Sequence, residues 1–558
     1  MADKFFIIKK IMLLLLLWQF ISVLLMALGV WPGSVAWLNF ALLSVFVIFF
    51  QPYESVLLLI LSAPFYVVLP NRYLDSLPAW RLLFIELFAV WFIHLAIKQK
   101  AYWQKLFSEG KKPKPNLGKI FLATARRLES RFLSWDKYVW LFLILALAST
   151  VFARFPWQGV KQVIFFINVY LFYIVFINVV TTREKVIEAV KYIVISLGII
   201  VALGYIQFAA TLFVAQYYFW QYWAIMVSRL YYGLHLANVL AYSNSWFSYA
   251  GSQQSLRMFS IMPDSHSFAM IAALFIGFAL PFVFLTGPLY RRTKNWLVKP
   301  FTKTYALWTA IRFTGLAIIL SGTRGMWVGM LLPLLVSIWL YAKKIVRPLA
   351  KKALISFLLI LFFFALSPFI NTGLNWFRLT YFKENFLQRV ASIYDLQEES
   401  NVGRLIIWEN SLKYSVSHPL GVGYGNFIVS LVPDIPANAS FQQVAEQKNL
   451  RYNLPQKFVT AHSLYLNLLV ELGFFGLLIF GLFAFEVLWV MWLFLRKHAG
   501  DVNFYTMTVL SAILTWLWFL GYSVFDVTIF NDRVLIFSLL GLGLAGIITR
   551  RYESFKEK

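Results

Sequence analysis

Long apolar runs separated by short polar segments dominate the chain, and this is the pattern of membrane-spanning helices. A helix that crosses the hydrocarbon core of a bilayer needs roughly 17 to 25 apolar residues, and runs of this kind predict about 14 such helices. They lie near residues 11–30, 34–50, 55–70, 81–97, 137–153, 162–180, 190–213, 267–287, 306–322, 325–341, 353–370, 463–495, 504–524 and 533–549. The pattern therefore predicts an all-α polytopic membrane protein.

The composition supports the same class. Of the 558 residues, 61% are hydrophobic, 19% are aromatic and only 13% are charged, and the mean hydropathy is +0.71. The core of a soluble domain cannot bury this much apolar surface. The chain has no cysteine, which excludes disulfides, thiolate metal sites and a cysteine nucleophile.

Basic residues, which give the chain a net charge of +26, are concentrated in the short segments between the apolar runs. These segments are 98–137, 182–185, 291–294, 343–352, 496–497 and 550–551. In the predicted topology they all lie on the side of Lys9 and Lys10, which the positive-inside rule assigns to the cytoplasm. We therefore expect both termini to be cytoplasmic, and the basic residues to contact anionic membrane lipids and not nucleic acid.

The polar segments divide the chain into four predicted parts. Residues 1–136 hold the first helices and a basic cytoplasmic loop, in which an amphipathic run from Ile120 to Trp135 is expected to lie on the inner leaflet. Residues 137–370 hold the central membrane helices. Residues 371–462 form a large, mostly helical loop on the outward face, which also receives a loop at 214–266. Residues 463–558 hold the last membrane helices.

Three charged or titratable residues lie at the outward ends of these predicted helices. His462 ends the longest polar loop directly before an apolar helix, and the near-neutral pKa of histidine suits proton transfer. Arg324 lies in a tight glycine-flanked turn where it can reach an anion, although arginines at helix ends also extend to lipid headgroups. Arg404 lies early in the large outward loop, where the alternative is a residue of a surface helix that buries Leu405 and Trp408.

In order, spacing and sidedness these residues resemble the O-antigen ligase superfamily, over about residues 250–490. The motifs are Ser321-Gly322-Thr323-Arg324-Gly325, Arg404 with Trp408, Gly421-Val422-Gly423-Tyr424-Gly425, and His462 followed by Glu471 and Gly473. The superfamily includes lipopolysaccharide O-antigen ligases, O-antigen polymerases and protein O-oligosaccharyltransferases. The resemblance implies a fold related to the C-type glycosyltransferases, in the bacterial inner membrane, with the active site on the extracytoplasmic face.

The resemblance also implies the reaction, in which a glycan moves from a polyprenyl pyrophosphate donor to an acceptor hydroxyl without a cofactor. It assigns the two essential arginines of the family to Arg324 and Arg404, and the essential histidine to His462. Two guanidinium groups can stabilise the charge of the departing pyrophosphate where a metal ion otherwise would. Neutral His462 can accept the proton of the acceptor hydroxyl, and a single displacement inverts the anomeric carbon.

A divalent metal is not expected in this site. The predicted outward loops contain no Asp-x-Asp, His-x-x-x-His or Glu-x-x-His motif, and their acidic residues are scattered along the sequence.

Further candidate residues come from two other outward segments. Residues 257–266 resemble the family pattern Arg-x-x-Gly-x-x-x-x-Pro-Asn, with Ser260 in place of the glycine and Asp264 in place of the asparagine. Arg257 and His266 are therefore candidates for binding glycan or phosphate, and the alternative is an Arg257–Asp264 pair that fixes the loop. Tyr424, inside the glycine-rich segment, is a third candidate substrate-binding residue.

No motif identifies the acceptor. Ligase-like transfer to a lipid or other surface glycan is favoured, and polymerisation is the nearest alternative. Protein glycosylation is less favoured because no appended soluble or pilin-binding domain is recognisable. The alternative of a different class is a transporter of the lipid-linked glycan. Transporters usually carry ionisable groups near the midplane of the bilayer and inverted repeats, whereas the candidate residues here lie at one predicted face.

Overall fold

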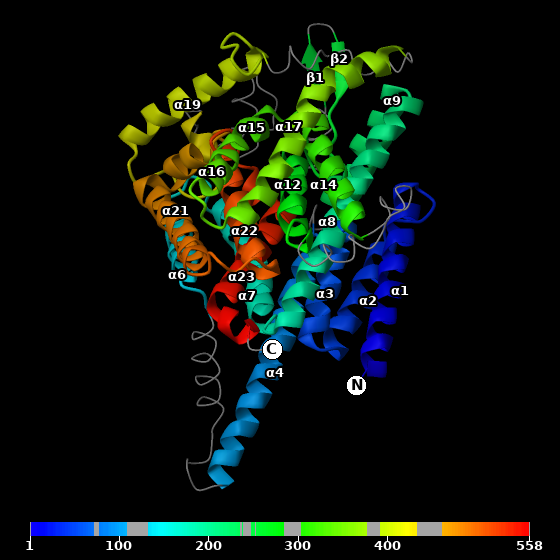
Figure 1. Cartoon of the computed structure of the whole chain (residues 1–558), viewed down its shortest axis with the longest axis vertical. Helices are drawn as coiled ribbons and strands as arrows, with labels where there is room; N and C mark the ends of the chain where they lie inside the picture. The colour runs from blue at the N-terminus through cyan, green and yellow to red at the C-terminus, as the bar shows by residue number, and fades with distance from the viewer. Residues whose placement is uncertain are drawn as a thin grey trace.

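The computed structural model describes residues 2–71, 77–108, 132–234, 237, 247–250, 253–283, 303–376, 391–431 and 460–556. Helices make up nearly all of the regular structure in these ranges (Figure 1). The α-helices are α1 (Ala2–Ala27), α2 (Val35–Phe49), α3 (Pro52–Ser62), α4 (Ala79–Ser108), α6 (Asp136–Ser149), α7 (Pro156–Val179), α8 (Arg183–Phe213), α9 (Gln216–Phe219), α10 (Ser228–Tyr232), α12 (Ser265–Ala279), α14 (Lys303–Leu320), α15 (Arg324–Gly329), α16 (Leu331–Ala342), α17 (Arg347–Trp376), α19 (Glu399–Ser417), α21 (Leu464–Lys497), α22 (Phe504–Tyr522) and α23 (Asp532–Lys556).

Short elements of other kinds connect these helices. The 3-10 helices are η1 (Ala63–Phe65), η4 (Phe427–Ser430) and η5 (Thr528–Phe530), and η2 (Trp220–Val227) is a π-helix. The strands β1 (Phe247–Ala250) and β2 (Gln253–Leu256) pair antiparallel, with Phe247 opposite Leu256. This hairpin lies in the predicted outward loop 214–266, and it is the one departure from the all-α prediction among the described residues.

Each of the fourteen predicted apolar ranges overlaps a helix, but the count of fourteen membrane spans is not confirmed. Within the described residues, 8 helices are long and apolar enough to cross a membrane. Four more apolar helices, Val35–Phe49, Pro52–Phe65, Ser265–Ala279 and Tyr305–Leu320, have 10–17 residues. At 1.5 Å per residue, helices of this length are shorter than a hydrocarbon core of roughly 30 Å. The chain is a multi-pass membrane protein, and its relation to the C-type glycosyltransferases stays a prediction.

Local sequence signals explain where several helices begin. The Asp264 carboxylate accepts a hydrogen bond from the Ser267 amide at 2.7 Å and caps α12. Asn503 and Thr506 form a reciprocal capping box at the start of α22. Proline occupies the first position of α3 and of α7, where a missing N–H costs no helical hydrogen bond. These starts place the polar ends of the helices at the boundaries of the apolar core.

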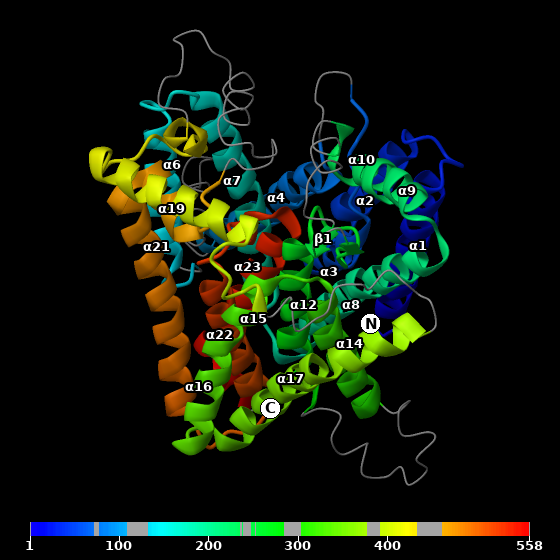
Figure 2. The same cartoon turned by 90° about the horizontal axis from the view of Figure 1, so that it is seen from above.

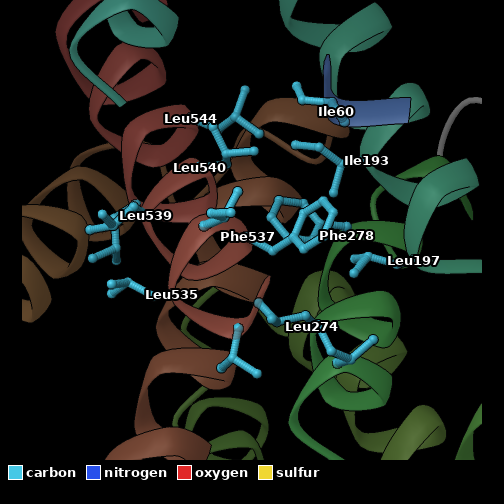
Figure 3. Packing of buried hydrophobic residues seen from close by; sticks show 14 of the residues in the cluster. Ile60, Ile193, Leu197, Leu274, Phe278, Leu535, Phe537, Leu539, Leu540 and Leu544 are labelled. Carbon is cyan, nitrogen blue, oxygen red and sulfur yellow. The ribbon is translucent and has the colours of Figure 1, made fainter. Parts of the chain in front are cut away.

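The largest apolar core extends through the whole bundle, and α8, α12, α22 and α23 pack together in one part of it. Figure 3 shows Leu274 and Phe278 of α12 meeting Ile193 and Leu197 of α8 and Phe537 of α23. These side chains are buried, and they stabilise the bundle through close packing. The core therefore holds the start of α12 and the loop before α23 in a defined relation to each other.

The two ends of the molecule differ in what they carry. Figure 1 shows α15, α19 and the β-hairpin toward one end, and both termini toward the opposite end. Seen from above in Figure 2, α19 lies over α21, in agreement with the contacts between the two helices. Both termini thus lie toward the same end of the molecule, and their position on the cytoplasmic side of a membrane stays a prediction. The amphipathic run predicted from Ile120 falls mainly within 109–131, outside the described residues.

Candidate active site

A cluster of charged and titratable side chains lies where the starts of α12 and α15, the helix α19 and the segments next to α21 and α22 meet. Most of its members come from helix ends, so that each polar group lies at the edge of the apolar bundle. The cluster includes Arg324, Arg404, His462 and His266, which were predicted from the sequence.

Arg324 is the first residue of α15, and α19 and the segment before it hold its side chain in place. Its Nη2 donates to both carboxylate oxygens of Glu398, at 3.0 and 2.9 Å, and its Nη1 donates to the carbonyl oxygen and the hydroxyl of Ser392, at 3.0 and 2.7 Å. The Arg324 side chain is only 10% exposed. Arg324 therefore points toward α19, in contrast to the alternative in which it extends to lipid headgroups.

Arg404 lies on α19, so the helical alternative is right about the helix, but Leu405 is 44% exposed and is not on its buried side. Arg404 nevertheless contacts the same cluster. Its Nη1 donates to the hydroxyl of Ser400 at 3.2 Å, and Nη2 of Arg324 approaches this same hydroxyl at 3.4 Å. The Nε atom of Arg404 is buried and has no hydrogen-bond partner among the described residues. Two guanidinium groups thus share one small hydroxyl, and Arg404 keeps donor capacity for a further anion.

His266, at the start of α12, contacts two polar groups from the neighbouring helix α22 and the loop that follows it. Its Nδ1 lies 2.6 Å from the Tyr522 hydroxyl at the end of α22 and 3.1 Å from a carboxylate oxygen of Asp526. The Tyr522 hydroxyl also donates to Asp526, at 3.3 Å. The histidine, the phenol and the carboxylate therefore form one hydrogen-bonded group, which fixes the orientation of the imidazole ring.

Asp526 lies in the loop between α22 and α23, near two histidines and Arg404. Its burial acts to raise the pKa of the carboxyl group, but His266, His462, the Val527 amide and Arg404 together hold that pKa below its usual value. The Val527 amide donates to the carboxylate at 2.7 Å. Asp526 is therefore the anion that links the two histidines and Arg404 electrostatically.

His462 lies directly before α21 and has a backbone φ of 48°, a value uncommon for a residue other than glycine. The residue before it, Ala461, accepts a hydrogen bond from the Trp408 indole of α19 at 3.0 Å, and the Ala461 amide donates to Asn467 at 3.2 Å. These contacts fix the turn that carries His462 and bring the histidine close enough to influence Asp526.

Arg257 lies at the edge of this cluster. Its side chain runs along Gly322, where an added Cβ would come within 3.4 Å of the Arg257 Cγ. The Met258 amide donates to the Leu320 carbonyl at 3.0 Å and keeps this segment beside the Ser321–Arg324 turn. Arg257 also interacts electrostatically with His266. Asp264, the alternative partner of Arg257 in the sequence, has its carboxylate on the helix cap of α12.

Tyr424 lies elsewhere. Its ring is 5% exposed and packs edge to face on Phe142 of α6, with ring centroids 5.6 Å apart. Its amide donates to the Ser149 hydroxyl at 3.0 Å. The structure therefore does not bring Tyr424 into the cluster of arginines and histidines, and burial raises the pKa of its hydroxyl.

The segment 419–425 around Tyr424 pairs with a break in α21, and we name this contact the glycine junction. Gly473, inside α21, has φ 65° and ψ −164°, which interrupts the helix. The Val422 and Gly423 amides donate to the Val470 and Glu471 carbonyls at 2.9 Å each, and the Phe474 amide donates to the Pro419 carbonyl at 3.1 Å. The glycine junction thus supplies backbone partners that the break leaves open.

Sequence reasoning missed Asp526, Tyr522, Glu398 and Ser400. Asp526 could have been found from the sequence, because it is the acidic residue in the short turn 523–531 between two apolar helices. Glu398 and Ser400 lie four to six residues before Arg404, a spacing that places Ser400 one helical turn from the arginine. Nothing in the sequence indicates that Tyr522 contacts His266.

A comparison with known families is consistent with this geometry. A family model described as O-Antigen ligase matches residues 307–481, a region that includes Arg324, Arg404 and His462. No curated protein matches the chain. His266, Tyr522 and Asp526 lie outside the matched region and complete the cluster from both flanking parts of the chain. Residues 307–481 of the chain are therefore similar to the O-antigen ligase family.

Proposed function

We propose that the protein transfers a glycan from a polyprenyl pyrophosphate donor to a hydroxyl of a lipid or other surface glycan acceptor, as O-antigen ligases do. The observation that carries the proposal is the approach of Arg324 and Arg404 to the one hydroxyl of Ser400, at 3.4 and 3.2 Å. Two fixed guanidinium groups side by side match a pyrophosphate better than they match a neutral ligand.

The charge on the leaving group explains why the proposed reaction needs two arginines. When the bond between sugar and phosphate breaks, negative charge grows on the pyrophosphate oxygens. Donors that are already oriented toward these oxygens stabilise the transition state more than the ground state. Glu398 holds Arg324 in place, and Arg404 has a buried Nε that can donate to a phosphate oxygen.

The acceptor hydroxyl needs a group that takes its proton during attack. His462 is our first candidate for this role, and a direct attack on the anomeric carbon inverts its configuration. His266 has a different role in the proposal. Its Nδ1 carries the hydrogen and donates toward Asp526, and its Nε2 is left as an acceptor that can orient the incoming hydroxyl.

The proposed membrane orientation places the candidate active site on the extracytoplasmic face of a bacterial inner membrane, with both termini in the cytoplasm. Two observations support it. The termini lie at the end of the molecule opposite α19 (Figure 1), and basic residues such as Lys9, Arg550 and Arg551 lie near those termini.

A transfer assay tests the proposal. Purified full-length protein is mixed with a polyprenyl-pyrophosphate oligosaccharide and candidate glycan acceptors, in EDTA and in Mg²⁺, and the products are separated by length. We expect transfer in both media, and loss of transfer in His462→Ala and Arg404→Ala. Lys413→Ala is the matched control, because Lys413 is an exposed cation on the same helix as Arg404.

Each result has a defined meaning. Addition of one preassembled glycan per acceptor supports ligation, whereas products of increasing repeat number indicate a polymerase. Full activity in both substituted proteins would contradict the assignment of the site. Movement of the lipid-linked glycan across liposomes without any transfer would make the protein a transporter.

A further inference from the structure

A polar cavity lies near the C-terminal end of α23, away from the candidate active site. Asp532, at the start of α23, and Arg550, near the end of this helix, are separated by about 27 Å at 1.5 Å per residue. The cavity has a volume of about 890 Å³. Its walls come from the start of α3, the later part of α4, the end of α7, the start of α8 and the end of α23.

Positive charge dominates the polar part of this cavity. Among the described residues, its lining includes the cations Lys98, Lys185, Arg550 and Arg551, against the single carboxylate of Glu54. Backbone carbonyls position two of the cations, since Lys185 donates to Val179 and Arg551 donates to Thr181, each at 3.1 Å. An ammonium or guanidinium group held by one carbonyl keeps further donors for an anion.

Two buried polar atoms in the lining lack a hydrogen-bond partner among the described residues. They are Nδ1 of His94 and one carboxylate oxygen of Glu54. Buried polar atoms in folded proteins are nearly always paired with protein or with a bound molecule. A ligand hydroxyl can donate to the Glu54 oxygen, and a hydroxyl or phosphate oxygen can accept from Nδ1 of His94 when that nitrogen carries a hydrogen.

The lining also has an apolar part, which includes Trp91, Leu95, Leu133, Ile177 and Ile547. Cations and apolar side chains thus share one cavity at the ends of membrane helices. This combination suits a molecule that has both an anionic phosphate and hydrocarbon chains, because basic pockets between membrane helices bind anionic lipid headgroups. A free phosphate would leave the apolar wall without a partner.

We propose that this cavity binds the headgroup of an anionic phospholipid in the leaflet opposite the candidate active site. The phosphate lies among Lys98, Arg550 and Arg551, and the acyl chains pass along Trp91 and Leu95 of α4. The proposal stands apart from the proposed glycan transfer, since it uses none of the residues of the candidate active site.

Native mass spectrometry of the full-length protein in mild detergent tests the proposal. Phosphatidylglycerol and phosphatidylcholine with the same acyl chains are titrated in turn, so that only the headgroup differs. We expect tighter binding of phosphatidylglycerol, and a loss of affinity of about tenfold or more in the double variant Arg550→Gln/Arg551→Gln. Lys98→Gln, at an exposed position, is a second variant that leaves the α23 contacts intact and is expected to weaken binding in the same direction.

The control removes two cations from another basic segment. Lys343→Gln/Lys344→Gln changes the net charge by the same amount, at exposed residues between α16 and α17, and is expected to leave the lipid affinity unchanged. Equal loss in this control would show a general charge effect and overturn the proposal. Equal binding of the two lipids would overturn it as well. Displacement of the lipid by millimolar inorganic phosphate alone would identify a free anion as the ligand and contradict the lipid assignment.

Discussion

The charged cluster and the glycine junction both contain residues of motifs that the sequence singled out, yet they are built in different ways. In the cluster, side chains from α12, α15 and α19 and from the loops beside α21 and α22 meet, and the contacts are hydrogen bonds between charged or titratable groups. In the glycine junction the contacts are between backbone atoms, and the side chains of Gly421 and Gly473 are absent because no space exists for them.

We therefore expect substitutions in the cluster to affect mainly the reaction, and substitutions in the junction to affect mainly the stability of the fold. A change in the cluster removes a charge or a proton donor and leaves the backbone as it is. A side chain added at Gly421 or Gly473 of the junction forces the backbone apart and affects folding first. Activity measured beside thermal stability therefore distinguishes the two regions.

The largest effect is expected from Arg404→Ala. Loss of one oriented donor to a developing negative charge lowers the rate of transfer by about 100-fold to 1,000-fold. Thermal unfolding in detergent should change little, because this side chain donates its hydrogen bond to the Ser400 hydroxyl, which Arg324 also contacts. Arg404→Lys is expected to restore only part of the rate, since an ammonium group cannot form the two parallel hydrogen bonds of a guanidinium group. A normal rate in Arg404→Ala would remove Arg404 from the proposed site.

Gly473→Ala should affect stability instead. Its backbone conformation is accessible almost only to glycine, and an added Cβ would clash with the Pro419 carbonyl oxygen. We expect the free energy of unfolding to fall by about 3 kcal/mol or more, measured by thermal or denaturant unfolding. Gly481→Ala, in the same helix but with no atom within 4 Å of the new Cβ, is the control and should unfold as the wild type does. Equal unfolding of both variants would mean that the break in α21 is not required.

Asp526→Asn should have a smaller effect, and one that depends on pH. The pKa of Asp526 is held below its unfolded value, so the ionised carboxylate stabilises the folded state at pH values above about 4. We expect a lower melting temperature than wild type at pH 7, and a difference that shrinks as the pH falls below about 4 and the wild-type carboxyl takes up a proton. The transfer rate should fall by about tenfold, because His266 loses an anionic partner. A difference in melting temperature that is the same at all pH values would contradict this account.

Tyr424→Phe should have the smallest effect and is the sharpest test of the boundary between the two regions. It removes only the hydroxyl of a ring that packs on Phe142, so neither the transfer rate nor the melting temperature should change by much. Tyr424→Ala empties the same space and should cost about 3 to 5 kcal/mol of stability. Loss of transfer in Tyr424→Phe at an unchanged melting temperature would instead support the prediction that Tyr424 binds substrate.

The positions of the helices could be predicted because the signal is local. Every apolar run predicted to be a helix overlaps one in the structure, from residues 11–30 to 533–549. The number of spans could not be counted in this way, since short apolar helices such as α2 and α12 have the composition of a span without its length. The hairpin of β1 and β2 was missed because two strands of four residues each give little periodicity.

In the candidate site, too, local motifs could be predicted from the sequence and contacts between distant segments could not. Arg324, Arg404 and His462 could be proposed because each lies in a recognisable motif. The contact of His266 with Tyr522 joins residues 256 positions apart, and it exists only because α12 packs on α22. Asp526 follows from the same packing. Pairings of this kind depend on tertiary structure and have no signature in one sequence.

The break in α21 has a consequence for the surrounding bilayer. The helix has 34 residues, and at 1.5 Å per residue it is about 50 Å long, against roughly 30 Å of hydrocarbon. The part before Gly473 is largely buried against other helices, which leaves residues 474–497 to match the membrane. Long helices adjust to thinner or thicker membranes by tilting. Because the break separates the two parts, such a tilt need not move His462, and we expect glycan transfer to be insensitive to the acyl-chain length of the host lipids.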